Sequence, residues 1–153
     1  LMLHLDYEKH PLSGKQRRLN LILYLSKDWD PAWKGATELW DESVTRCEVS
    51  SEVVFNRAIV FQTNEMSWHG VPEIIRCPRG TYRKTLAFYY MSPLTSAPND
   101  EKVGANQEGF RTKACFKQRP QDTKDAGIDA LLAIRPHRRL TAEDVRHHCP
   151  NWI

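Results

Sequence analysis

Residues 18–25 read Arg-Leu-Asn-Leu-Ile-Leu-Tyr-Leu, and this stretch indicates the fold class most directly. Leucine occupies every second position from residue 19 to residue 25, which is the alternation of a β-strand. The leucines therefore share one apolar face, suited to packing. The opposite face carries Arg18, Asn20, Ile22 and Tyr24 and supplies polar groups for a site.

Further strand-like segments follow along the first part of the chain. Residues 35–40, 46–50, 53–61 and 82–91 are short, separated by turn residues, and in part rich in β-branched and aromatic side chains. No helical period precedes about residue 123. The pattern predicts a mainly β domain, either a sandwich or a barrel.

The composition changes after Pro93. Residues 92–122 are polar and interrupted by proline and glycine, although residues 112–117 could add an edge strand. A short helix is predicted over residues 123–134, and a second is predicted to begin at Thr141 with a variant capping box. We therefore divide the chain into a core, residues 1–92, and a C-terminal extension, residues 93–153, that packs on it.

Charge and composition bound the functional classes. The 153 residues carry 22 basic and 19 acidic side chains without long blocks, so we expect no nucleic-acid partner, and the pairs Arg17-Arg18 and Arg138-Arg139 are interpreted as surface charges. No apolar run would span a bilayer and no signal peptide is evident, so we expect a cytoplasmic chain without a membrane partner. The four cysteines are expected to be free thiols, and a polar terminus is favoured over a zinc site formed by residues 147–149 with Cys115.

One widely separated set of residues points to chemistry. His4, Asp6 and His69 provide two imidazoles and one carboxylate, the ligand set of a non-haem Fe(II) site with open positions. In an extended segment, residues 4 and 6 share a face and can hold one metal ion. By the same rule Arg83 and Thr85 share a face, where a guanidinium and a hydroxyl would bind a carboxylate. The expected ligand is a small acidic molecule beside the metal.

These residues, with the stretches 18–30 and 37–41, resemble the Fe(II)- and 2-oxoglutarate-dependent oxygenases of the prolyl 4-hydroxylase group. The resemblance covers residues 4 to about 91 and implies a double-stranded β-helix, or jelly roll. It implies that His4, Asp6 and His69 bind Fe(II), that Arg83 and Thr85 bind the distal carboxylate of 2-oxoglutarate, and that O2 takes part, with ascorbate as a candidate accessory reductant. By the same resemblance Tyr24 lies near that carboxylate and Asn20 lines the pocket.

The resemblance also implies an activity. We expect a dioxygenase that hydroxylates an unactivated carbon, prolyl 4-hydroxylase-like, while 2-oxoglutarate is decarboxylated to succinate. The carboxylate of Asp6 favours hydroxylation over halogenation, which needs that position for halide. The same chemistry on a free amino acid or sugar, and a catalytically inactive binding module, stay open as alternatives, as does the oligomeric state.

The position of His4 in the chain leads to one structural expectation. Members of the family generally have helices and a core strand before the first metal ligand. We therefore expect a fragment whose barrel lacks its first strand unless the extension or a partner replaces it, leaving an exposed sheet edge.

Overall fold

The computed structural model describes residues 2–94 and 110–150 and confirms the mainly β prediction. The elements in chain order are β1 (Leu3–Leu5), β2 (Gln16–Tyr24), the 3-10 helix η1 (Pro31–Trp33), β3 (Thr37–Trp40), β4 (Cys47–Ser51), β5 (Ala58–Gln62), β6 (Trp68–Gly70), β7 (Thr85–Ser92), β8 (Cys115–Lys117), α1 (Ala126–Ile134) and α2 (Ala142–His148). Most predicted segments form strands close to their expected bounds. Residues 53–57 precede β5 instead of belonging to it, and β6 was not predicted because three residues show no period.

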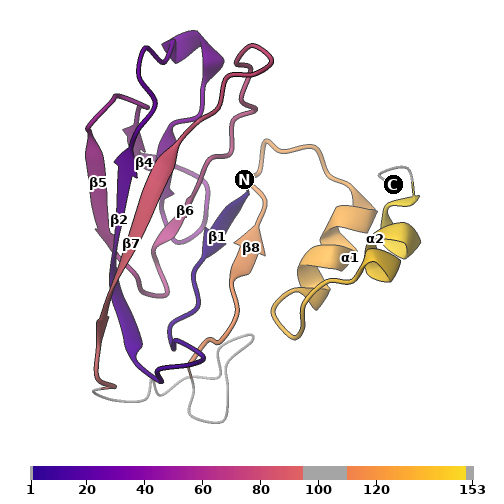
Figure 1. Ribbon diagram of the computed structural model, residues 1–153. Helices are drawn as coiled ribbons and strands as arrows, with labels where there is room; N and C mark the ends of the chain where they lie inside the picture. The colour runs from indigo at the N-terminus through magenta and orange to yellow at the C-terminus, as the bar shows by residue number, and fades with distance from the viewer. Residues whose placement is uncertain (1, 95–109, 151–153) are drawn as a thin grey trace.

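The strands form two antiparallel sheets. One contains five strands in the order β4-β3-β6-β1-β8, and the other contains three in the order β5-β2-β7 (Figure 1). The chain crosses between the two sheets several times within the core. As a result β1 and β6, which are far apart in sequence, are neighbours in the five-stranded sheet. This pairing places His4 beside His69.

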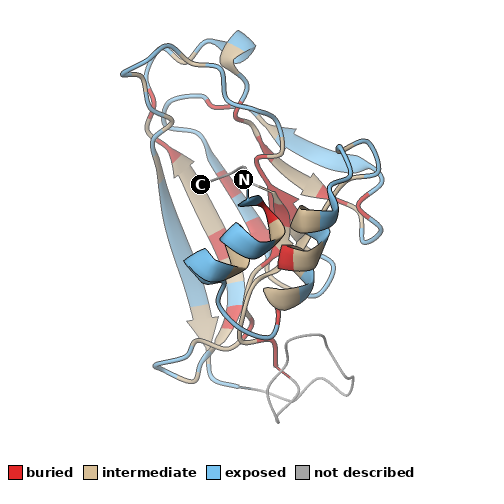
Figure 2. Cartoon of the chain, turned by 90° about the vertical axis from the view of Figure 1, so that its right-hand side faces the viewer, coloured by how far each residue is buried: buried red, intermediate tan, exposed pale blue. Residues whose placement is uncertain are grey.

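The leucine face of β2 lies on the outer side of its sheet, which differs from the predicted packing. Its leucines are half-buried, and the neighbouring Val60 and Phe88, each paired with Leu21, are exposed. Asn20 and Tyr24, on the opposite face, are almost completely buried. Within the described residues the polar face is therefore the internal one. Figure 2 shows buried residues among the strands and long exposed stretches along the outer strands.

A β-bulge interrupts the alternation at the start of β2. The pairing with β7 shifts between Arg17 and Leu19, so that two residues of β2 oppose one residue of β7. As a result Arg17 lies on the internal face with Asn20 and is only 2% exposed. The prediction that Arg17 is a surface charge is therefore wrong.

The C-terminal extension contributes one strand and two helices. β8 pairs with β1, within the residues predicted as an edge strand, and α1 and α2 lie beside β8 (Figure 1). Thr141 and Asp144 form the predicted capping box of α2. Part of the expected irregular segment, residues 95–109, lies outside the described residues. None of the described helices has the length and apolar character needed to cross a membrane.

Candidate metal centre

His4, Asp6 and His69 converge on one point between the sheets. His4 of β1 is paired directly with His69 of β6, and Asp6 follows immediately after β1. One possible ligand atom from each of the three lies within 4.8 Å of the others. In the described part of the chain this is the one cluster of histidine, cysteine and acidic side chains that could hold a metal ion.

Both imidazoles are oriented by backbone carbonyl groups. The Nδ1 atom of His4 lies 3.0 Å from the Met2 carbonyl oxygen, and that of His69 lies 2.8 Å from the Ser67 carbonyl oxygen. Because a carbonyl oxygen only accepts, each Nδ1 must carry the hydrogen and donate it. In the neutral ring this leaves the Nε2 lone pair free, and both Nε2 atoms face Asp6. Burial, together with the neighbouring His69, lowers the pKa of His4 and favours the neutral form that a metal requires.

The Asp6 carboxylate is held from one side. Its Oδ2 atom lies 2.7 Å from Nη1 of Arg17 and accepts a hydrogen bond of 2.5 Å from the amide of Asn20. Arg17 is itself stacked between the rings of Tyr7 and Tyr89, 3.9 Å from each centroid. Burial opposes ionisation of Asp6, but before a metal binds, a hydrogen bond from His69 and its charge, followed by the charge of Arg17, outweigh burial and lower the carboxyl pKa. Asp6 is therefore an ionised, oriented oxygen ligand whose Oδ1 faces His4.

Arg83 lies in the same cavity as the three candidate ligands. Its Nε donates to the Gly35 carbonyl oxygen over 2.6 Å, and its Nη2 donates to the Thr37 hydroxyl over 2.9 Å. Burial lowers the pKa of this guanidinium, and no described carboxylate forms an ion pair with it. A partly buried cation that pairs with no carboxylate of the described residues is suited to an anionic ligand.

Thr85 and Tyr24, the two other residues predicted to lie near the distal carboxylate, occupy different positions relative to the cavity. Thr85 is the first residue of β7 and lines the cavity with Arg83, although Arg83 itself precedes the strand. Tyr24 is fully buried; its ring centroid lies 5.3 Å from the guanidinium carbon of Arg83, and its hydroxyl donates to the Ser51 carbonyl oxygen. Asn20 lines the cavity as predicted from its face of β2. Sequence analysis missed Thr37, whose inward position on β3 shows no distinctive local signal.

The cavity is small and its wall combines two kinds of polar group. It has a volume of about 190 Å³ and is lined both by His4, Asp6 and His69 and by Thr37, Arg83 and Thr85. Ile22, Val71 and Ala87 add apolar wall. An elongated dianion could therefore meet a metal and a guanidinium simultaneously.

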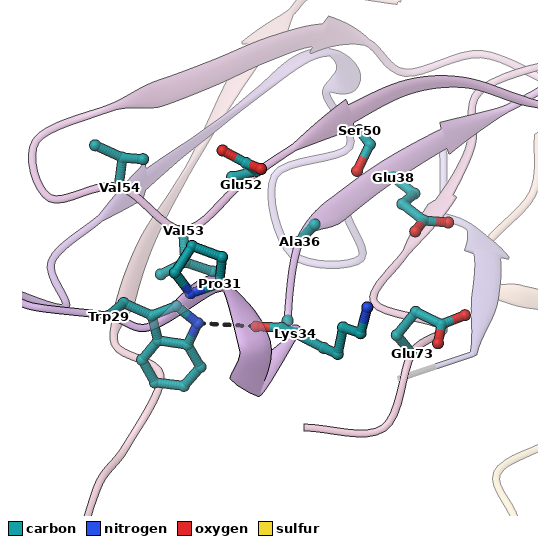
Figure 3. A pocket seen from close by; sticks show the side chains of 11 residues that line it. Trp29, Pro31, Lys34, Ala36, Glu38, Ser50, Glu52, Val53, Val54 and Glu73 are labelled. Atoms are coloured by element: carbon teal, nitrogen blue, oxygen red, sulfur yellow. Dashed lines mark hydrogen bonds between the residues drawn. The ribbon is translucent and has the colours of Figure 1, made fainter. Parts of the chain in front are cut away.

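A second cavity lies on the other face of β3. Its lining includes Ala36 and Glu38, which alternate along the strand with the inward-facing Thr37. Trp29 borders it and donates an indole hydrogen bond to the Lys34 carbonyl oxygen (Figure 3). Neither Trp29 nor Lys34 lines the cavity that contains the histidines, so β3 separates two cavities with different linings.

Comparison with known families settles the class of this site. Residues 1–91 match the model of the 2OG-Fe(II) oxygenase superfamily. The chain belongs to this superfamily. Its two antiparallel sheets are the double-stranded β-helix of these oxygenases, and the family implies oxygenase chemistry that uses Fe(II), 2-oxoglutarate and O2. No match was found among curated proteins.

The residues present fit the metal that the superfamily uses. Two imidazole Nε2 atoms and one carboxylate are the donor set of the facial triad found in non-haem Fe(II) oxygenases, and these three residues would hold the metal. When bound, Fe(II) supplies the activation of O2. The protein's own residues orient the ligands through the two carbonyl groups and through Arg17 and Asn20, and Arg83 provides the charge that would hold a carboxylate.

Proposed function

We propose that this oxygenase is a hydroxylase of the prolyl 4-hydroxylase type. In this proposal His4, Asp6 and His69 hold Fe(II), and Arg83, with Thr85 and Thr37, binds the distal carboxylate of 2-oxoglutarate. One atom of O2 enters the substrate as hydroxyl, and the other enters succinate as 2-oxoglutarate loses CO2. Ascorbate would serve to keep the iron reduced.

The observation that carries the proposal is the shared cavity. The ligand atoms of the triad lie within 4.8 Å of one another, and the guanidinium of Arg83, which pairs with no described carboxylate, lines the same space. 2-Oxoglutarate has the two features that such a space requires, an oxo acid that chelates a metal and a second carboxylate for the arginine. The carboxylate of Asp6 favours hydroxylation over halogenation because it occupies the position that a halide would need.

The prolyl preference is supported by the resemblance of the strand end and turn over residues 24–29 to the hypoxia-type prolyl hydroxylases. A free amino acid or a sugar is the second substrate class, and an inactive binding module is the third interpretation. Each gives a different experimental result.

The test is anaerobic reconstitution of the protein with Fe(II), followed by O2, 2-oxoglutarate and ascorbate. Succinate formation in the absence of substrate should depend on both Fe(II) and 2-oxoglutarate. A library of proline-containing peptides is then examined by mass spectrometry for products that have gained one oxygen atom. Asp6→Ala, which removes one ligand without adding bulk, is the matched inactive control.

The outcomes separate the three interpretations. Oxygenated peptide that requires wild-type Asp6 supports the prolyl hydroxylase. Succinate formation stimulated by free amino acids or sugars, with no peptide product, would replace it by small-molecule oxidation. Folded, iron-loaded protein that forms no succinate under any condition would contradict the enzymatic proposal and leave the binding module.

A further inference from the structure

The C-terminal extension contacts the metal-binding segment at two places. The family match ends at residue 91, so the residues of the extension that make these contacts lie outside the matched core. β8 pairs with the whole of β1, and Arg111 contacts the residues that follow β1. Both contacts involve candidate metal ligands or their backbone.

Arg111 holds the backbone on both sides of Tyr7. Its Nε donates to the Asp6 carbonyl oxygen over 2.9 Å, although the two residues are 105 positions apart in sequence. Its own N–H donates to a carboxylate oxygen of Glu8 over 2.9 Å, and its carbonyl oxygen accepts from the Glu8 N–H over 2.7 Å. Arg111 is 4% exposed and Glu8 is 7% exposed, so water competes little for these bonds.

This support matters because Asp6 lies just beyond the end of β1. Its backbone is therefore not held by the ladder that β1 forms with its neighbours. The bonds from Arg111 replace that ladder and determine where the Asp6 side chain begins. Arg17 and Asn20 then orient the carboxylate itself.

Phe116 of β8 supports the other ligand on this segment. It is the direct partner of His4 in the sheet, and the two rings stack with centroids 5.4 Å apart and an interplanar angle of 30°. The ring of His69 lies near His4 as well, with centroids 4.4 Å apart. The His4 imidazole is thus packed by both neighbouring strands and has little freedom to rotate.

We infer that residues 110–117 form a positioning segment for the metal, in which Arg111 places Asp6 and Phe116 fixes the ring of His4. The inference rests on the proposed metal site. Groups that orient ligands typically affect metal affinity 10- to 100-fold, because a misplaced ligand must be reorganised on binding. Arg111 and Phe116 are positioning residues and would not touch the metal.

The test measures Co(II) affinity and the visible absorption spectrum of bound Co(II) in full-length variants. Arg111→Leu should weaken Co(II) binding roughly 10-fold or more and alter the spectrum. Phe116→Leu should weaken it by about threefold or more, whereas Phe116→Tyr retains the ring and should keep near wild-type affinity. Arg138→Leu is the matched control, because Arg138 pairs with Asp144 inside the extension and not with the metal-binding segment.

Affinities are compared at a temperature where circular dichroism shows each variant to be folded. Loss of folded protein is then not mistaken for loss of Co(II) affinity. Wild-type protein that binds no Co(II) would overturn the proposed function itself. Wild-type binding together with an Arg111→Leu variant of unchanged affinity and spectrum would overturn only the positioning role. If Arg111→Leu does not fold, equal affinities of the leucine and tyrosine variants at position 116 would overturn it instead.

Discussion

Replacing Arg83 tests how the site recognises its acidic co-substrate. Arg83→Met removes the guanidinium and its hydrogen bonds to Gly35 and Thr37 while retaining an unbranched apolar stem. A hydrogen bond to a charged group contributes about 1.5–3 kcal/mol, so the Kd for 2-oxoglutarate should rise roughly 10- to 150-fold. Iron affinity should change by less than about twofold, because Arg83 is not part of the ligand cluster.

The assay is calorimetric titration of the Mn(II)-loaded protein, which binds without turnover. Two ligands are compared, 2-oxoglutarate and 2-oxopentanoate, which has the same carbon chain without the distal carboxylate. The wild type should prefer 2-oxoglutarate, and Arg83→Met should lose most of that preference. Binding of 2-oxopentanoate should change little, because it makes no ion pair with the guanidinium.

The control is Arg79→Met, an identical replacement at an exposed position of the preceding turn. It should leave both affinities and the preference unchanged. Equal loss of metal and 2-oxoglutarate affinity in Arg83→Met would refute the assigned role and indicate that Arg83 only maintains the cavity. An undiminished preference for 2-oxoglutarate would refute it as well.

Three further predictions concern stability and pH. A Cβ at Gly127 would lie 2.0 Å from the backbone oxygen of His148, so Gly127→Ala should lower the free energy of unfolding by about 1–3 kcal/mol in urea titrations, and a rise would contradict the close helix contact. Gly35 has a φ of +96° and its Cβ would lie 3.2 Å from the Cδ atom of Arg83, so Gly35→Ala should reduce both the Tm and 2-oxoglutarate affinity; an unchanged Tm would contradict the strain. The hydrogen bonds to Asp144, first from an arginine and then from the N-cap threonine, lower its pKa, so its stabilising effect is present above the unfolded value of about 3.9 and is lost as the pH falls below it. Asp144→Asn should therefore make the Tm less sensitive to acid, as measured from neutral pH to about pH 3, and a variant with the same acid sensitivity would contradict this assignment.

Local patterns predicted much of the core. The alternation along residues 18–25 placed Asn20 and Tyr24 on one face, and both are buried on the internal side of β2. The same period predicted that His4 and Asp6 approach one point, and the structure brings them together with His69. The helix that follows Thr141 was visible because its cap and its third residue are close in sequence. Each of these features depends on neighbouring residues, so a single sequence contains the signal.

Which face of β2 is internal depended on the second sheet. Leucine alternation indicates a packed face, yet in the described structure the leucines lie outside and the polar face borders the cavity. The partners of the face, not its composition, decide this outcome. The bulge beside Arg17 is a further case, because a register shift between two strands places that arginine against Asp6 although strict alternation would direct it outward.

The sequence by itself determined the ligand types, their chemistry and the β-rich fold, since residue identity and local period are sufficient for these. Only the tertiary structure decided how the ligands are supported. Arg111 reaches Asp6 across 105 positions, and Thr37 meets Arg83 across 46, in contacts that have no local period. Such pairs are created by strand order and register, which depend on the free energy of the whole chain and are not encoded in any one stretch.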